Sequence, residues 1–277
     1  MTHTANGTGI HRGAAREVGP ETAALNARWA DALIGALCAS GVRDAVVSPG
    51  SRNTPLVLAL AARSERSSLR VHAILDERSA AFYALGIARV TGAPVVLSCT
   101  SGSAGAHWLP AVIEADHSRL PLVLLTADRP PELHGAGAPQ TVHQSGLFGR
   151  HVRLQADPGC PIPGPLGWLR TLAARAVDAA AGTRPGPVHL NLPLREPLWD
   201  RDQAPLPPVD AAPSIVRGAP RLDDAVISSL ATELRGEPRG ALVLGPGDSG
   251  VCGPSRAAHL EGLTRAARRL ARALGWP

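Results

Sequence analysis

The chain has 277 residues, of which 44% are apolar and 18% are charged, so it is long enough to bury a sizeable core. Its net charge of +5 is spread without a basic block, and only 3% of its residues are aromatic, which argues against nucleic-acid binding. No apolar run reaches transmembrane length and the first twenty residues lack a signal-peptide core, so a cytoplasmic protein without a membrane span is expected. In chain order, residues 1–20 are predicted to form a disordered leader.

Strand and helix patterns alternate over residues 21–197. A helix is predicted over Glu21–Ala39, where Leu25, Trp29, Leu33 and Leu37 recur at a spacing of four. Short apolar segments predict strands at Asp44–Ser48, Val71–Leu75, Pro94–Cys99, Pro121–Thr126 and Val188–Leu192. Helices are predicted after Thr54, which is expected to cap its helix, and over Arg78–Val90, Gly102–His117 and Pro165–Ala181. This order predicts an α/β domain, a parallel sheet with helices on both faces.

The remainder of the chain predicts a second, smaller unit. Residues 198–220 are rich in Pro, Asp and Ala without periodicity, which is typical of a linker. Residues 221–277 predict a helix over Leu222–Leu234, a strand over Gly240–Leu244 and a basic amphipathic helix over Leu260–Leu274. Because a lone helix–strand–helix cannot close a sheet, this second α/β domain is expected to be incomplete.

The four cysteines are far apart and contain no C-x-x-C pair. Cys38, Cys99, Cys160 and Cys252 are therefore expected to be buried thiols in a reducing cytosol rather than a disulfide set or metal ligands. The ten histidines show no ligand spacing either, so no metal site is predicted in this chain.

The loop Ser48–Leu56 joins the first predicted strand to a helix. It places Ser51 and Arg52 where a strand's carboxyl end meets a helix amino end, so backbone N–H groups and a guanidinium converge. This arrangement favours a carboxylate or phosphate ligand. The alternative is an ordinary turn with a solvated arginine.

Two further strand ends carry polar or small residues. Glu77 begins the helix after the second strand, where a carboxylate is favoured, although it could simply be a helix-terminal charge. The small side chains of Ala80–Ala88 are expected to permit close packing against a neighbour or a partner subunit, on an exposed face. The turn Cys99–Gly105 lets backbone approach a flat ligand, but it lacks both G-x-G-x-x-G and the P-loop lysine.

A fourth strand end presents a second arginine. Arg129 is predicted at the same sheet edge as Arg52, and two arginines there make a dianionic small molecule plausible. Gln140 and Gln144, in the loop that follows, could add amide contacts.

In order and spacing, these segments resemble a known family. The stretches SPGSRNTPL, DERSAAFYALGIAR, CTSGSA, LPAVIEA, LTADRPPEL and QTVHQSGLFG resemble the 2-succinyl-5-enolpyruvyl-6-hydroxy-3-cyclohexene-1-carboxylate synthases of menaquinone biosynthesis, which are thiamine-diphosphate enzymes. The resemblance covers roughly Leu25–Pro197 and implies the pyrimidine-binding domain of that family.

The resemblance implies roles for individual residues. Glu77 would be the catalytic glutamate that hydrogen-bonds the aminopyrimidine ring, and Pro49, Ser101 and Gly102 would lie near the cofactor. The substrate-binding positions would be those of Ser51, Arg52, Arg129 and Gln140. The implied substrates are 2-oxoglutarate and isochorismate, the implied cofactors thiamine diphosphate and Mg²⁺, and the implied assembly a homo-oligomer or a complex with a separate carboxyl-terminal subunit.

The sequence departs from the family pattern in two ways. Family members usually have Asn immediately before the loop glutamine, where this chain has Pro139. The family is also about twice as long, and its last domain carries the Gly-Asp-Gly motif and the metal ligands. Gly245–Gly250 is superficially similar but is expected to be an ordinary loop after a strand. The chain is therefore expected to be the amino-terminal half of such an enzyme, as a truncated chain or as one subunit of a split enzyme. One alternative is a non-catalytic remnant that binds a partner chain or an acid. Another is an acetolactate-synthase-like enzyme, against which the paired SPGSR and TADRPPEL motifs argue.

Overall fold

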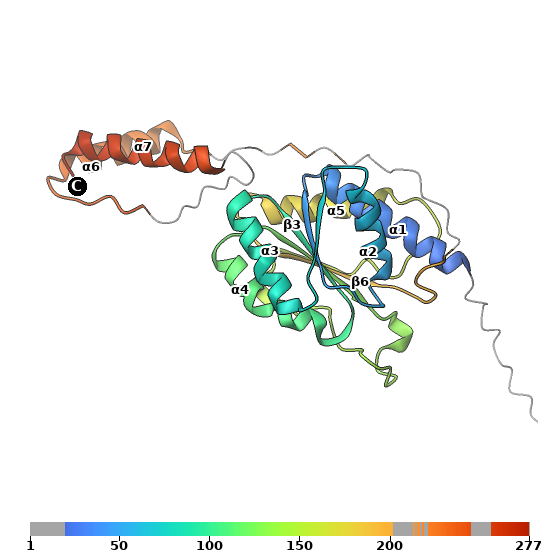
Figure 1. Ribbon diagram of the computed structural model, residues 1–277. Helices are drawn as coiled ribbons and strands as arrows, with labels where there is room; N and C mark the ends of the chain where they lie inside the picture. The colour runs from blue at the N-terminus through green and yellow to red at the C-terminus, as the bar shows by residue number, and fades with distance from the viewer. Residues whose placement is uncertain are drawn as a thin grey trace, which may run out of the picture.

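The computed structural model describes residues 20–201, 213, 215–216, 218, 221–244 and 256–276. Its main feature is a six-stranded, entirely parallel sheet with the order β2-β1-β3-β4-β6-β5 (Figure 1). The strands are β1 (Asp44–Val47), β2 (Arg70–Ala73), β3 (Val95–Cys99), β4 (Leu122–Asp128), β5 (Leu154–Ala156) and β6 (Val188–Pro193).

Helices cover both faces of this sheet, as the alternating apolar pattern predicts (Figure 1). The helices are α1 (Pro20–Ala39), α2 (Thr54–Ser64), α3 (Glu77–Thr91), α4 (Leu109–His117) and α5 (Gly167–Ala181). Alternate strand residues face opposite cores: Val47 packs with α1, α2 and α5, whereas Val46 packs with α3 and α4. The predicted fold class is thereby confirmed.

Several predicted boundaries were wrong. The strand predicted over Pro121–Thr126 runs to Asp128, because Ala127 and Asp128 pair with β6. The helix predicted over Gly102–His117 is a 3₁₀ helix η1 (Gly102–Trp108) followed by α4. Pro110 lies in the first turn of α4, where a missing N–H is tolerated.

The predicted cap of α2 was also wrong. Asn53 occupies the N-cap position without a side-chain cap bond, and Thr54 is the first helical residue. The Thr54 hydroxyl donates to the carbonyl oxygen of Ser51 at 2.8 Å, so it stabilises the preceding turn instead.

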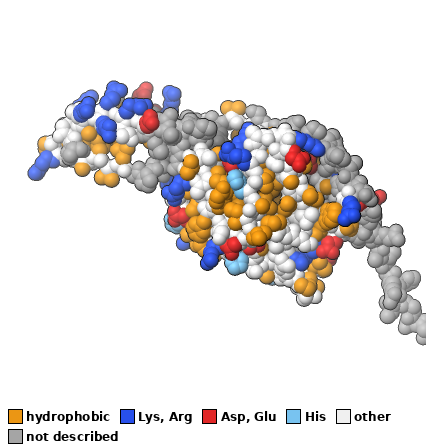
Figure 2. All heavy atoms as spheres, viewed as in Figure 1, with side chains coloured by type: hydrophobic (Ala, Val, Ile, Leu, Met, Phe, Trp, Pro, Cys, Tyr) orange, Lys and Arg blue, Asp and Glu red, His pale blue; other side chains and the backbone are white. Residues whose placement is uncertain are grey.

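The small side chains of α3 face the interior of the domain. Ala80, Ala81, Ala84 and Ala88 are all fully buried in the core beneath α3 and α4. The expectation that this small-sided face is exposed for a partner was therefore wrong. The exposed face of α3 instead carries Phe82, Tyr83 and Val90, on a side of the molecule where hydrophobic side chains gather (Figure 2).

Two further helices, α6 (Asp224–Gly236) and α7 (Arg256–Leu274), lie apart from the sheet (Figure 1). Trp276 Nε1, which follows α7, donates to the carbonyl oxygen of Glu237 at 3.2 Å. The strand predicted over Gly240–Leu244 was wrong: these residues pair with no strand in the described part of the chain, and Val243 is 91% exposed. Residues 1–19, most of the predicted linker, Gly245–Gly250 and Cys252 lie outside the described residues.

Among the residues that the structure describes, no helix has both the length and the apolar character needed to cross a bilayer.

Candidate active site

The candidate residues follow four neighbouring strands of the sheet. Because all strands are parallel, the loops after β2, β1, β3 and β4 emerge at one edge. Glu77 follows β2, and Pro49, Ser51 and Arg52 follow β1. Ser101 and Gly102 follow β3, and Arg129 and Gln140 follow β4. The expectation of one shared edge is confirmed, whereas the roles of the individual residues stay predictions.

The loop after β1 is a compact turn held by a buried asparagine. Asn53 Oδ1 accepts from the Gly50 N–H at 2.8 Å, and its Nδ2 donates to the Ser48 carbonyl at 3.1 Å. Gly50 faces Thr100 so closely that an added Cβ would lie 2.6 Å from the Thr100 Cβ. The turns after β1 and β3 therefore touch, and only Gly fits at position 50 without a shift. Ser51 and Pro49 are left exposed.

Arg52 is not the solvated side chain of an ordinary turn. It is 5% exposed, and its Nη1 donates to the Leu194 carbonyl at 2.9 Å. Its Nη2 lies 2.6 Å from Glu196 Oε1, while its Nε is buried without a hydrogen-bond partner. No sequence motif indicates Glu196 as its partner, since Glu196 lies 144 residues away along the chain.

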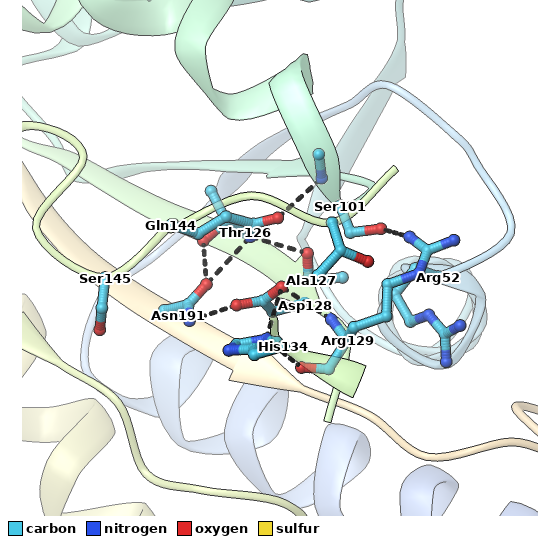
Figure 3. Close-up of polar contacts among 12 residues, drawn as sticks. Arg52, Ser101, Thr126, Ala127, Asp128, Arg129, His134, Gln144, Ser145 and Asn191 are labelled. Atoms are coloured by element: carbon cyan, nitrogen blue, oxygen red, sulfur yellow. Dashed lines mark hydrogen bonds and ion pairs between the residues drawn. The ribbon is translucent and has the colours of Figure 1, made fainter. Parts of the chain in front are cut away.

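Arg129 lies beside Arg52 at the same edge (Figure 3). Its Nη1 donates to Ser101 Oγ and, at 3.0 Å, to the carbonyl oxygen of Gln140. Burial, followed by repulsion from the Arg52 charge, lowers the pKa of Arg129. Two neighbouring guanidinium groups make this edge strongly attractive to a carboxylate.

The two loop glutamines have different positions. Gln140 is exposed and has φ +55°, and its Nε2 donates to the Ser101 carbonyl at 3.0 Å. Gln144 is buried, and its Oε1 accepts from the Gly102 N–H at 2.7 Å. Gly102 has φ +86°, and a Cβ there would lie 2.7 Å from Gln140 Cγ, so this turn requires glycine.

A buried polar network supports the loops from below (Figure 3). Gln144 Nε2 donates to the Ala127 carbonyl and to Asn191 Oδ1, each at 3.0 Å. Asn191 Nδ2 in turn donates to Asp128 Oδ2 at 2.8 Å and to Asp157 Oδ2 at 3.0 Å. Sequence reasoning missed Asn191, which lies within β6, and Asp128, which ends β4, because neither belongs to a local motif.

Glu77 is the first residue of α3. The adjacent Asp76 caps the helix by accepting from the Ser79 N–H at 2.7 Å, which leaves Glu77 free of that task. The Glu77 side chain is half-buried and makes no hydrogen bond or ion pair within the described part of the chain. Burial, and then the charge of Glu77, raise the pKa of the Cys99 thiol well above its ordinary value. An unpartnered carboxylate at a helix amino end fits an external N–H donor such as an aminopyrimidine ring.

The region that carries these loops is similar to known proteins. Residues 27–147 match the family described as "Thiamine pyrophosphate enzyme, N-terminal TPP binding domain". This part of the chain is therefore similar to the amino-terminal cofactor-binding domain of thiamine pyrophosphate enzymes. The match contains Pro49, Glu77, Ser101 and Arg129, so it spans all four strand-end loops described above.

Curated relatives make the resemblance narrower. The chain is 45% identical over 259 residues to a 2-succinyl-5-enolpyruvyl-6-hydroxy-3-cyclohexene-1-carboxylate synthase of Geobacillus kaustophilus, covering 90% of this chain and 42% of that protein. Proteins with the same name match at 45% over 249 residues in Dechloromonas aromatica and at 50% over 222 residues in Chloroflexus aurantiacus. The Dechloromonas aromatica match covers 89% of this chain and 44% of the relative. The Chloroflexus aurantiacus match covers 79% of this chain and 37% of the relative. The resemblance that the motifs predict is confirmed, and the chain spans about two-fifths of the relatives' length.

Proposed function

We propose that this chain is the pyrimidine-binding part of a thiamine-diphosphate-dependent synthase that joins decarboxylated 2-oxoglutarate to isochorismate. The observation that carries the proposal is the 45% identity over 259 residues to a synthase of that name, across the segments that carry the candidate site. The bound cofactor would supply the electron sink for loss of CO₂ from the oxo acid.

The residues of this chain would bind and orient the cofactor ring and the substrate. Glu77 would accept a hydrogen bond from the cofactor's aminopyrimidine ring, because its carboxylate is half-buried and has no partner within the described residues. Ser101 and Gly102 would form the adjacent wall, with Gly102 fixed by Gln144. The guanidinium of Arg129 would attract a substrate carboxylate, and the exposed Ser51 and Gln140 would add polar contacts.

The residues that would hold Mg²⁺ and the diphosphate belong, in this proposal, to the length of the relatives that this chain does not cover. The second unit from residue 221 onward would begin the central domain of the synthase. An assembly of two copies, or of this chain with a carboxyl-terminal subunit, would then complete the site. A cytoplasmic location and the role of Pro139 stay predictions.

A chimera tests the proposed function. This chain would replace the matching segment of the Geobacillus kaustophilus synthase, and the product would be assayed with 2-oxoglutarate, isochorismate, thiamine diphosphate and Mg²⁺. Product formation that is lost on Glu77→Gln would support the proposal. A folded chimera that binds cofactor without turnover would favour the non-catalytic alternative. Pyruvate consumption without use of isochorismate would favour an acetolactate-synthase-like enzyme.

A further inference from the structure

Arg52 is paired with a carboxylate supplied by the segment after β6. Its Nη2 lies 2.6 Å from Glu196 Oε1, but the two side chains differ strongly in burial: that of Arg52 is 6% exposed and that of Glu196 is 67% exposed. The guanidinium is thus inside the protein, whereas the carboxylate reaches it from the solvent side. Glu196 follows β6, the next strand in the sheet after those that carry the candidate site.

The backbone around Glu196 is fixed on both sides. Asn26 of α1 is 1% exposed, and its Nδ2 donates to the carbonyl oxygens of Arg195 at 2.8 Å and Pro197 at 3.1 Å. Before it, the Leu194 N–H donates to the Asp128 carbonyl at 3.0 Å, and the Leu194 carbonyl accepts from Arg52. These bonds hold the residues that flank Glu196, so its approach to Arg52 is built into the fold.

The pair solves an electrostatic problem at this edge. Arg52 and Arg129 repel one another, and Glu196 is the nearby carboxylate that opposes this repulsion together with Asp128. Asp128 is fully buried and accepts from Asn191, whereas Glu196 is bonded to the guanidinium itself. A guanidinium has five N–H donors, and Arg52 uses one on each terminal nitrogen for Leu194 and Glu196. Donors remain for a ligand once these two bonds have fixed the plane of the group.

We propose that Glu196 is a positioning residue that orients Arg52 so that its remaining donors bind a carboxylate of the substrate together with Arg129. This inference rests on the proposed function for the identity of the ligand, a dicarboxylic oxo acid. It adds to the prediction made from the sequence, in which both arginines bind substrate and no residue orients Arg52. Arg52 binds through the orientation that Glu196 imposes, and Asn26 keeps Glu196 in place.

A double-mutant cycle on the full chain tests the proposal. Binding of 2-oxoglutarate would be measured by calorimetry for the wild type, Glu196→Ala, Arg52→Met and the double variant. Met is chosen because it keeps most of the buried volume of the arginine stem. Glu196→Ala is expected to weaken binding about tenfold in the wild-type background and to have no further effect beside Arg52→Met, because coupled residues are non-additive. The ¹⁵N signal of the buried Arg52 Nε–H, shifted in Glu196→Ala, supplies a readout of orientation without ligand.

Glu132→Ala is the matched control. Glu132 Oε1 lies 2.6 Å from Nε of Arg195, the residue that precedes Glu196. Glu132 is therefore also paired with an arginine, but its partner is Arg195 and not Arg52. It is expected to leave the dissociation constant within about twofold of the wild type, because exposed ion pairs contribute little. Glu196→Gln, which keeps an acceptor oxygen, is expected to restore part of the loss.

The proposal would be overturned by equal or tighter binding in Glu196→Ala, which would mean that Glu196 merely competes with the ligand. Additive effects in the double variant, an unchanged Arg52 signal, or no 2-oxoglutarate binding by the wild type would also overturn it. These outcomes are independent of the chimera assay. An inactive chimera together with a non-additive cycle would refute the synthase function but support the proposed role of Glu196. An active chimera together with an additive cycle would support the synthase function and refute that role.

Discussion

Gln144 and Gly102 are joined by a 2.7 Å hydrogen bond from the Gly102 N–H to Gln144 Oε1, although 42 residues separate them in the sequence. The bond connects the turn after β3 to the long loop after β4. Because the amide of Gln144 also reaches the Ala127 carbonyl and Asn191, one side chain fixes two walls of the candidate site.

Replacing Gln144 by Ala is expected to lower the free energy of unfolding by about 2–4 kcal/mol, because buried backbone and side-chain groups lose their partners. Gln140→Ala is the matched control: this glutamine is exposed, and its loss is expected to cost about 1 kcal/mol or less. Urea denaturation of both variants measures the difference. Equal losses would show that the Gln144 network does not stabilise the loops.

The turn at Gly102 predicts a contrast between two glycines. Gly102 and Gly146 have φ values of +86° and +81°, but only at Gly102 would a Cβ meet another residue, Gln140 Cγ at 2.7 Å. Gly146→Ala is expected to cost about 1 kcal/mol from backbone strain alone, and Gly102→Ala more, about 2–3 kcal/mol. Thermal and urea unfolding would measure both. A Gly102→Ala protein no less stable than Gly146→Ala would contradict the close contact.

Glu77→Gln is expected to reduce 2-oxoglutarate decarboxylation by the chimera at least about a hundredfold while leaving the unfolding temperature unchanged. An amide cannot share a proton as a carboxylate does, and Glu77 has no partner within the described residues whose loss would destabilise the fold. CO₂ release measures the rate. Asp76→Asn, which alters the neighbouring helix cap, serves as the control and is expected to keep most of the activity. Near-normal decarboxylation by Glu77→Gln would remove Glu77 from the chemistry.

Arg129→Ala is expected to lower kcat/KM for the carboxylate substrates by roughly tenfold to a hundredfold, since a lost charge-assisted pair costs about 1.5–3 kcal/mol. Arg150, an exposed arginine of the 3₁₀ helix η3 (Gly149–His151), supplies a control of equal charge change. Steady-state kinetics of the two chimeras separate local from general electrostatics. If both variants behave alike, Arg129 does not contact substrate.

His189 predicts a pH dependence of stability. Its Nε2 lies 2.7 Å from Thr126 Oγ1, its Nδ1 is buried without a partner, and burial lowers its pKa from 6.5 to about 4 despite the opposing charge of Asp157. Between these values the unfolded chain binds a proton here that the folded chain does not. Stability is therefore expected to fall as the pH falls from about 6.5 to about 4, by up to about 3 kcal/mol.

His189→Gln replaces the imidazole by a side-chain amide, whose nitrogen can donate to Thr126 but does not titrate. The expected result is that its stability is flat over this pH window relative to the wild type, measured by urea denaturation at each pH. Parallel curves for the two proteins would assign the pH dependence to other groups.

The parts of the fold that the sequence predicted are those with a local physical signal. The apolar run Leu122–Leu125 and the spacing of Leu25, Trp29 and Leu33 were enough to predict β4 and α1. β5 was missed because Leu154–Ala156 is three residues long and partly exposed, so neither alternation nor an apolar run marks it.

The candidate site divides in the same way. Glu77, Ser101 and Arg129 follow predicted strands, and the parallel sheet alone brings them to one edge. The partner of Arg52 could not be predicted, because Glu196 lies in a proline-containing segment and is brought to Arg52 by the pairing of β6 with β4. The burial of the α3 alanines could not be predicted from their spacing either, since small residues suit both a contact inside the domain and a contact with a partner.

Cys99, the last residue of β3, is fully buried, and its thiol has a pKa well above the ordinary value, first because of burial and then because of the Glu77 charge. An alkylating reagent can therefore reach this sulfur only during brief local openings of the strand end. Mass spectrometry would measure how fast the Cys99 peptide becomes labelled. This rate would report how often the carboxyl end of β3 opens. A ligand that covers this strand end would slow the labelling, so a native cysteine can report occupancy without an activity assay.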